Sequence, residues 1–433
     1  MRIAFYTLGC KVNQYESQVM AQQFQAAGFE PVPWPGPAEV YVINSCTVTA
    51  QSEKKAAQLL RRLQREHPRA LLVLCGCWPQ AFPQQAAQTG AHVVAGTARK
   101  GLVQLVNRAL ETGRQVVEVA PHTKEEAFEP MQATAMEGHT RAFVKIEDGC
   151  DRFCSYCMIP FARGRVRSKP LQELSREITF LAEKGFREVV LTGINLSSYG
   201  KGEGFDLADG VKTAAAVKGI ERVRLGSLEP DLTDDLLIEK LAVEKKFCPQ
   251  FHLSVQSGCD ATLKRMNRRY TAEEYLALCA KLRAAFDLPA ITTDLMVGFA
   301  GETEEEFGQT LAFLKEAGFA KTHVFPYSRR PGTKADRLEN QLDEGTKARR
   351  AQQAAAVADQ SQHSFLQSMV GRLEPVLFER CNLPGKGRGH TPNGTQVLVD
   401  CGRNLRGSIL PVRITGVSQD SQYCLGELMG ELP

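Results

Sequence analysis

The sequence lacks any apolar run of about 18 residues, the length from which a membrane-spanning helix is inferred. Its first ten residues have too short an apolar part for a secretory signal and no convincing cleavage site, and they fit a first strand better. Basic and acidic residues nearly balance, at 53 and 49, so the net charge of +4 permits nucleic-acid binding without arguing for it. We therefore expect a cytoplasmic protein with no membrane segment.

Cysteine, in contrast, is abundant, with 13 residues in a chain of 433. In a reducing compartment such a count indicates metal or cluster ligation instead of disulfides. The length predicts two or three domains. A hydrophobic content of 43% and a charged content of 24% are those of an ordinary globular protein.

Three cysteines, Cys150, Cys154 and Cys157, form a C-x3-C-x2-C motif. Thiolates are the usual ligands of iron–sulfur clusters, and three of them leave one iron of a four-iron cluster without a protein ligand from this loop. Such an iron can bind a substrate or cofactor. The alternative is structural zinc, which is four-coordinate and usually takes its cysteines in C-x2-4-C pairs. No fourth Cys or His lies nearby, which makes zinc the less favoured interpretation.

This motif, with Tyr156 before its last cysteine, resembles that of the radical S-adenosylmethionine (SAM) superfamily. The longer string from Cys154 to Ser168 resembles the methylthiotransferase branch. The resemblance implies that the open iron chelates the amino and carboxylate groups of SAM. It also implies that an electron from the cluster cleaves SAM to a deoxyadenosyl radical, with Tyr156 near the cofactor.

The first 118 residues alternate strand and helix patterns. Strands are expected at Arg2–Tyr6, Val40–Asn44 and Ala70–Leu74, and helices at Asn13–Ala27 and Ser52–Glu66, with Asn13 and Ser52 as N-caps. This alternation predicts a small α/β domain with a parallel sheet.

Cysteines follow each of these strands: Cys10, then Cys46, then Cys75 and Cys77. Because sites in such sheets collect at the carboxyl ends of strands, these side chains indicate a second cluster site. Alternatively, each is a small buried hydrophobe. The methylthiotransferase resemblance implies a second [4Fe-4S] cluster here, and the family pattern Gly-Cys-x-x-Gln selects Cys77 over Cys75. Trp78 and the proline after it depart from the family's Tyr-Ala.

Residues 141–368 repeat strand and helix patterns six times, which fits an open (β/α)6 partial barrel with its chemistry at the strand C-termini. The expected strands are Ala142–Ile146, Glu188–Thr192, Glu221–Gly226, Gln250–Val255, Ala290–Met296 and Lys321–Phe325. The expected helices are Leu171–Lys184, Ala272–Ala285 and Glu304–Ala317.

Polar residues and glycines follow several of these strands. By resemblance to the superfamily they are candidate SAM contacts: Gly193, Asn195, Ser227, Glu229 and Gln256. A glycine lets the backbone approach a ligand closely, and an asparagine side chain offers both a donor and an acceptor. The alternative for the polar residues is a helix cap or a surface turn.

Residues 369–433 contain short β-like stretches between glycine-rich turns, which predicts a small β-barrel. Its His390-Thr-Pro-Asn393 string and the Leu-Arg406-Gly that follows resemble the TRAM domain, an RNA-binding module. The resemblance makes His390, Asn393 and Arg406 candidate RNA contacts. Gly394 stands where the family has Tyr, which would weaken stacking on a base.

A basic stripe directly follows the C-x3-C-x2-C loop. Arg163, Arg165 and Arg167 are candidate RNA phosphate contacts or members of an ordinary solvated face. The remaining cysteines are expected to be packing residues: Cys75, Cys248, Cys259, Cys279, Cys381, Cys401 and Cys424.

The resemblance thus covers three domains in order: 1–118, 141–368 after a linker at 119–140, and 369–433. It is closest to the MtaB-type tRNA methylthiotransferases. It implies transfer of a methylthio group to C2 of N6-threonylcarbamoyladenosine at position 37 of tRNA, with two [4Fe-4S] clusters and with SAM as radical source and methyl donor. The implied partners are the tRNA anticodon loop, a reductant such as flavodoxin or ferredoxin, and a sulfur donor.

Three alternatives remain at this point. One is a sister specificity, for isopentenyladenosine in tRNA or an aspartate in a ribosomal protein. Another is a non-catalytic RNA-binding protein with structural metal. The third is an electron-transfer protein, which needs neither a TRAM-like end nor glycine-rich SAM-like loops.

Overall fold

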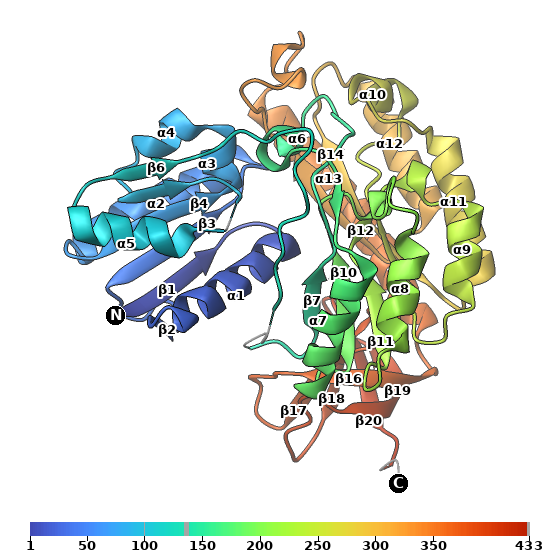
Figure 1. Ribbon diagram of the computed structural model, residues 1–433. Helices are drawn as coiled ribbons and strands as arrows, with labels where there is room; N and C mark the ends of the chain where they lie inside the picture. Colours follow the sequence, from blue (N-terminus) through green and yellow to red (C-terminus); the bar gives the residue numbers. More distant parts are fainter. Residues whose placement is uncertain (99, 134–137, 431–433) are drawn as a thin grey trace.

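The computed structural model describes residues 1–98, 100–133 and 138–430. An N-terminal α/β domain lies beside a central α/β body, and a small β-barrel lies against one end of the central body (Figure 1). Part of the predicted linker (134–137) and the end of the predicted third domain (431–433) lie outside the described residues.

The N-terminal domain is built on a six-stranded, fully parallel sheet with the order β2-β1-β3-β4-β5-β6. Its strands are β1 (Arg2–Thr7), β2 (Glu30–Val32), β3 (Val40–Ser45), β4 (Leu71–Gly76), β5 (Val93–Ala95) and β6 (Val116–Glu118). Its helices are α1 (Lys11–Ala26), α2 (Ala50–Glu66), α3 (Cys77–Ala81), α4 (Pro83–Ala87) and α5 (Leu102–Thr112). Apolar clusters cover both faces of the sheet, one under α1 and α5 and the other under α2 and α4.

Both predicted N-caps in this domain are wrong. Helix α1 begins after Cys10, and α2 begins after Thr49, whose side chain accepts a hydrogen bond from the backbone N–H of Ser52. Asn13 lies inside α1, where its Nδ2 donates to the carbonyl oxygens of Leu8 (2.8 Å) and Ser45 (3.1 Å). Its side chain therefore ties the loop after β1 to the end of β3.

The central body is the expected open α/β partial barrel of parallel strands. Its strands are β7 (Ala142–Lys145), β10 (Glu188–Thr192), β11 (Arg222–Leu225), β12 (Ser227–Leu228), β13 (Gln250–Leu253), β14 (Ala290–Val297) and β15 (Lys321–Pro326). The order β7-β10-β11 continues as β12-β13-β14-β15, because the third strand unit divides at Gly226 into β11 and β12.

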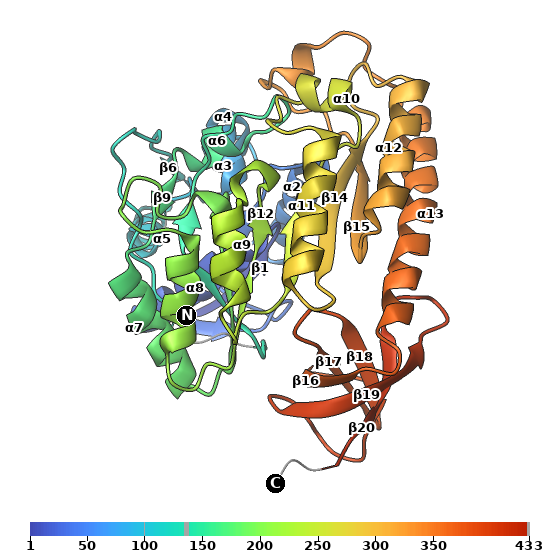
Figure 2. The same ribbon diagram turned by 90° about the vertical axis from the view of Figure 1, so that its right-hand side faces the viewer.

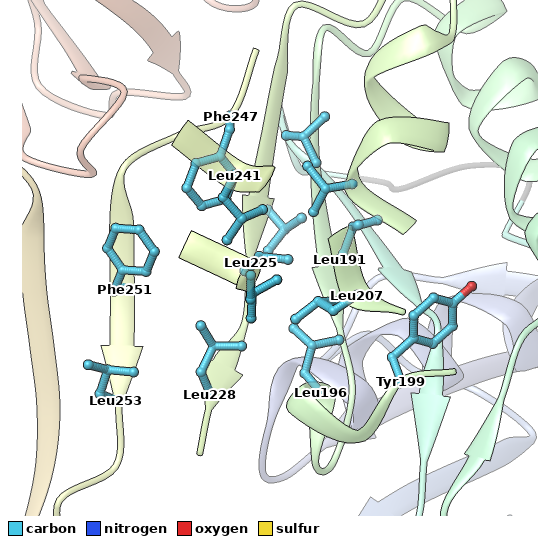
Figure 3. Close-up of a cluster of buried hydrophobic side chains, with 14 of the residues drawn as sticks. Leu191, Leu196, Tyr199, Leu207, Leu225, Leu228, Leu241, Phe247, Phe251 and Leu253 are labelled. Atoms are coloured by element: carbon cyan, nitrogen blue, oxygen red, sulfur yellow. The ribbon is translucent and has the colours of Figure 1, made fainter. Parts of the chain in front are cut away.

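Helices cover the outer side of this sheet (Figure 2). They are α7 (Leu171–Glu183), α8 (Leu207–Ala216), α9 (Asp235–Ala242), α10 (Asp260–Arg265), α11 (Ala272–Ala285) and α12 (Glu304–Ala317). Figure 3 shows part of the large apolar core between the two layers, with Leu191, Leu225 and Phe251 from the strands near Leu207 and Leu241 from the helices. Before α7, helix α6 (Ile159–Arg163) and the short pair β8 (Glu147–Asp148) and β9 (Arg167–Ser168) frame the cysteine loop.

One long helix, α13 (Glu344–Ser368), was not expected from the sequence. It packs along β15, and its end enters the core of the C-terminal barrel through Leu366 (Figure 2). Its sequence is rich in Ala and Gln, so its apolar stripe is too thin to be recognised from periodicity.

The C-terminal domain is a closed barrel with the strand order β16-β17-β18-β20-β19. Its strands are β16 (Leu373–Glu379), β17 (Lys386–His390), β18 (Gln396–Asp400), β19 (Ile409–Val417) and β20 (Cys424–Leu428). Cys424 is buried in its core and half-buried Cys401 packs against that core, as expected for packing residues, whereas half-buried Cys381 lies outside the cluster. Among the described helices, none is long and apolar enough to cross a membrane.

Candidate active site

The first cysteine site lies at the carboxyl edge of the N-terminal sheet. Cys10 follows β1 and precedes α1, Cys46 follows β3, and Cys77 opens α3 after β4. The chain leaves β1 for β2 and leaves β3 for β4, so the strand order reverses between β1 and β3. In open α/β sheets this reversal creates the crevice in which ligands bind.

The loops that carry these cysteines are in direct contact. Gly9 has φ of +106°, and a Cβ built on it would lie 2.9 Å from the Cβ of Cys46 and 3.1 Å from its Sγ. Only glycine accommodates both the backbone conformation and this approach. Burial, followed by the proximity of Cys77, raises the pKa of the Cys46 thiol to about 12.

Cys75 and Cys77 have different surroundings. Cys75 lies within β4 and packs in the apolar core on the α1 and α5 side of the sheet. Cys77 lies past the strand end, where its Sγ accepts a hydrogen bond from the Nε of Arg163 at 3.2 Å. This placement favours Cys77 as the third thiolate of the site.

The second cysteine site is the loop between β8 and α6. Cys150, Cys154 and Cys157 are half-buried there, and the loop is tightened by a hydrogen bond of 3.0 Å from the N–H of Cys157 to the carbonyl oxygen of Cys154. The Sγ of Cys154 accepts a hydrogen bond from Nη1 of Arg268 at 3.3 Å. Burial is the main cause that raises the pKa of Cys150 to about 12.

Within the described residues, no three His, Cys, Asp or Glu side chains converge on a point that one metal ion would occupy. Structural zinc needs four ligands on one ion. A four-iron cluster does not, because its thiolates bind separate irons. Two trios of thiols, one of Cys10, Cys46 and Cys77 and the other of Cys150, Cys154 and Cys157, are donor sets whose chemistry suits such clusters.

Beside the second cysteine loop lie two buried oxygen atoms that have no partner in the described chain. They are Oδ1 of Asn195 and Oε1 of Glu147. The other carboxylate oxygen of Glu147 accepts from the backbone N–H of Asn195 at 2.7 Å, and Nδ2 of Asn195 donates to Oγ of Ser198 at 2.8 Å. Buried acceptors of this kind need donors, and the amino group of SAM would supply them.

The other predicted SAM contacts differ in what they can offer. A Cβ on Gly193 would lie 2.5 Å from Oε2 of Glu147, so a side chain cannot stand there. Gln256 is held at a φ of +66°, with its backbone N–H donating to the carbonyl oxygen of Asp294 at 2.9 Å. Strained backbone of this kind clusters at functional sites. Tyr156 packs edge-on against Phe299, with 6.2 Å between ring centroids.

Ser227 is exposed on β12, whereas Glu229 is already engaged. The carboxylate of Glu229 pairs at 2.6 Å with Arg268, the residue that reaches Cys154. Arg268 and Glu147 could not be recognised from the sequence, because neither belongs to a motif and both reach the site only through the fold.

Most side chains of the basic stripe are buried, which corrects the prediction of RNA contacts for Arg163 and Arg167. Arg163 is fully buried. Arg167 is 8% exposed and donates to Glu126 at 3.0 Å. Carboxylates from distant segments neutralise both side chains, which sequence spacing cannot show. Arg165 alone remains half-exposed, with its guanidinium 5.2 Å from the ring centroid of Phe153.

His390 and Asn393 have structural contacts that their predicted role as RNA contacts does not include. Both pack at the junction with the strand starts of the central barrel. Nη1 of Arg222 donates to the carbonyl oxygen of His390 at 3.1 Å, and Nδ2 of Asn393 donates to the carbonyl oxygen of Leu288 at 3.0 Å. The string that resembles TRAM therefore docks the small barrel on the central body.

Arg406 lies elsewhere on the small barrel, in an open pocket of about 590 Å³. The basic residues that line this pocket are Arg380, Lys386, Arg403 and Arg406. This pocket keeps the character of a phosphate-binding surface.

Comparison with known proteins identifies two parts of the chain. Residues 144–314 match the radical SAM superfamily, and residues 2–96 match the uncharacterized protein family UPF0004. The fold resembles that of TsrM from Kitasatospora setae, a radical S-adenosylmethionine methyltransferase, with a TM-score of 0.57 and 13% identity over 88% of this chain and 79% of that one.

Relatives extend over nearly the whole chain. The threonylcarbamoyladenosine tRNA methylthiotransferase MtaB of Bacillus subtilis is 36% identical over 95% of this chain and 93% of that protein. MtaB of Thermotoga maritima is 38% identical over 86% of this chain and 85% of that protein. The tRNA-2-methylthio-N(6)-dimethylallyladenosine synthase of Pelotomaculum thermopropionicum is 34% identical over 94% of both chains.

Proposed function

The chain belongs to the radical SAM tRNA methylthiotransferase family, and we propose that it adds a methylthio group to C2 of N6-threonylcarbamoyladenosine at position 37 of tRNA. Membership implies SAM and [4Fe-4S] clusters as cofactors. When bound, these cofactors supply the radical chemistry that an unactivated adenine C2–H requires.

Two ligand sets divide the work in this proposal. Cys150, Cys154 and Cys157 hold the cluster that binds SAM. Cys10, Cys46 and Cys77 hold the cluster that carries the sulfur to be transferred. The hydrogen bond from Arg163 to Cys77 supports a pairing of the two ligand sets, because Arg163 ends α6 just after the loop of Cys150, Cys154 and Cys157.

The chain's own residues would position the cofactor. Asn195 and Glu147 offer buried acceptors to the amino group of SAM, and the absence of a side chain at Gly193 lets the carboxylate of Glu147 pack against the backbone there. Arg268 holds the carboxylate of Glu229 and the Sγ of Cys154 together, so it fixes the loop against the strand end after β12.

One observation favours threonylcarbamoyl over dimethylallyl as the group on the adenine. The inner face of the sheet, opposite the helices, carries His252 on β13, Asp294 on β14 and His323 on β15. Nε2 of His252 lies 3.3 Å from Oδ2 of Asp294, whose side chain is 30% exposed. A polar, accessible wall suits the hydroxyl, amide and carboxylate of a threonylcarbamoyl group, whereas an apolar dimethylallyl group would make no hydrogen bond with it.

The proposed tRNA partner fits the remaining basic surface, with Arg165 beside the cysteine loop and Arg406 in the pocket of the small barrel. A reductant such as flavodoxin or ferredoxin and a sulfur donor complete the reaction, and a tRNA substrate puts it in the cytoplasm. Replacement of Arg165 or Arg406 by a neutral residue should lower the affinity for tRNA, and this loss should be larger at low salt than at high salt.

The test compares two RNA substrates. Reconstituted enzyme with SAM, reductant and sulfide as the sulfur source should methylthiolate an anticodon stem-loop that carries threonylcarbamoyladenosine and leave one with dimethylallyladenosine unmodified, as measured by mass spectrometry of the nucleosides. A preference for the dimethylallyl substrate would overturn the specificity, and no methylthiolation of either would overturn the proposed function. His323→Leu should lower activity on the threonylcarbamoyl substrate without lowering SAM cleavage.

A further inference from the structure

Arg163 is a fully buried arginine that connects the two halves of the proposed active site. It ends α6, six residues after Cys157 in the central body. Yet most of its side-chain partners belong to the N-terminal domain. Nε donates to Sγ of Cys77 at 3.2 Å, Nη2 donates to Oδ1 of Asn13 at 2.6 Å, and both terminal nitrogens donate to the carboxylate of Glu16.

The guanidinium is held in one orientation. The planar guanidinium donates hydrogen bonds to a carboxylate, an amide oxygen and a sulfur at the same time, and lysine cannot reproduce this geometry. Asn13 in turn donates to the carbonyl oxygens before Cys10 and before Cys46, at Leu8 and Ser45. One side chain from the central body thus reaches all three cysteine loops of the N-terminal domain, directly or through Asn13.

The charges around Arg163 are compensated locally. Lys145 pairs with Glu16 at 2.8 Å and with Asp148 at 2.6 Å, and Nη1 of Arg163 lies 3.4 Å from Oδ2 of Asp148. Asp148 stands two residues before Cys150. The same buried network therefore extends from the first cysteine loop to the second.

We propose that Arg163 is a positioning residue for the sulfur-carrying cluster, whose ligand Cys77 it hydrogen-bonds from the domain that generates the radical. This inference rests on the proposed function, because it needs Cys77 as a cluster ligand. Hydrogen bonds to ligand sulfurs and nearby charge set the reduction potential of an iron–sulfur cluster. A donor on Cys77 stabilises the more negative, reduced cluster and so raises its potential.

Two consequences follow for the reaction. The contact lets a residue of the central body influence the reduction potential of the sulfur-carrying cluster in the N-terminal domain. It also fixes the orientation of that cluster relative to the SAM site, since the residue that touches Cys77 follows the SAM loop by one short helix. Separation of the two domains would break both effects together.

The experiment uses the full chain with Cys150, Cys154 and Cys157 replaced by alanine, so that only the N-terminal site can be loaded. In this parent we compare Arg163→Met, Arg163→Lys, Glu16→Gln and Arg187→Met. Arg187 is a surface arginine paired with Glu221 and serves as the matched control. The readouts are iron per chain, the midpoint potential followed by electron paramagnetic resonance, and the melting temperature.

The expected result is a shift of the midpoint potential to more negative values in Arg163→Met. A smaller shift in the same direction is expected in Arg163→Lys, which keeps the charge but loses the Nε contact. Glu16→Gln removes the ion pair and keeps the arginine on Cys77, so it should lower the melting temperature without a negative shift. Arg187→Met should change neither quantity.

An unmoved potential in loaded Arg163 variants would overturn the inference alone. So would an equal negative shift in Glu16→Gln, because it would assign the effect to domain packing. If Arg163→Met does not fold, Arg163→Lys decides in the same way. A parent chain that binds no cluster would overturn the ligand set of the proposed function, and the inference with it.

Discussion

The two cysteine sites reach the same local chemistry by different routes. Each contains a cysteine whose Sγ accepts from the backbone N–H two residues later, Cys46 from Val48 and Cys157 from Ile159, both at 3.4 Å. Each also contains a cysteine that accepts from a buried arginine of the central body, Cys77 and Cys154.

The difference is in assembly. The second site comes from one loop of eight residues, so it needs little more than that loop and its neighbours. The first takes its thiols from the ends of three strands, so it exists only when the whole N-terminal sheet is formed. Local damage should therefore disable the second site selectively, whereas the first should respond to changes far from its cysteines.

The largest expected effect separates the chemistry of the two sites. Cys154→Ala should abolish reductive SAM cleavage, because it removes a ligand of the SAM-binding cluster. Cys46→Ala should retain cleavage and lose methylthiolation. Deoxyadenosine production with dithionite, measured beside methylthio product, tests both variants, and deoxyadenosine from Cys154→Ala would contradict the assignment.

The next effect distinguishes the two neighbouring cysteines of β4 and α3. Cys77→Ala should lower iron by about four atoms per chain, the content of one cubane. Cys75→Ala should keep that iron and lose only packing, at a cost of about 1 kcal/mol in the free energy of unfolding. Iron analysis after anaerobic reconstitution, with thermal unfolding of the same samples, is the measurement, and equal iron loss in both would refute the choice of Cys77.

Substituted glycines should reveal how each site tolerates strain. Gly9→Ala and Gly149→Ala both place an alanine where the backbone has a positive φ. The new Cβ at position 9 would meet Cys46, and the one at position 149 would meet the carbonyl oxygen of Arg165. We expect a loss of about 1–3 kcal/mol in the free energy of unfolding for each, and loss of iron only from the affected site. Gly185→Ala is the control, because its φ is +90° with no heavy atom within 4 Å, and it should cost no more than about 1 kcal/mol.

The smallest effect concerns SAM alone. Asn195→Ala removes a buried acceptor and should weaken SAM binding about tenfold, the worth of one hydrogen bond to a charged group. Iron content and the potential of the N-terminal cluster should not change. Equilibrium binding of SAM to the reconstituted enzyme measures it, and unchanged affinity would remove Asn195 from the cofactor site.

Features that depend on local sequence can be predicted from the sequence, whereas features assembled from distant segments cannot. The strand at Glu188–Thr192 and the helices at Ala272–Ala285 and Glu304–Ala317 have the predicted bounds, because their apolar periodicity and, for the helices, capping residues are local. Arg163 could not be placed in this way. Its partners Asn13, Glu16 and Cys77 lie far away in sequence, so the basic run predicts a surface residue where the fold buries one.

The C-terminal barrel gives the same lesson in another form. The His390–Asn393 string resembles an RNA-binding module in sequence, and in the fold it contacts Arg222 and Leu288 at the junction with the central body. A motif indicates that a residue is constrained. Only the fold tells whether the constraint comes from a ligand or from a neighbouring domain.

Helix α13 has a consequence for the distance between the proposed RNA-binding pocket and the proposed active site. It runs along β15 and ends inside the core of the small barrel, which is also fastened to the central strands by Arg222 and Arg224. The small barrel is thus rigidly attached to the central body and is not joined to it by a flexible linker. If the proposed basic pocket binds the RNA, this rigid attachment would fix the distance from that contact to the proposed active site, and the modified nucleotide would be the one at that distance.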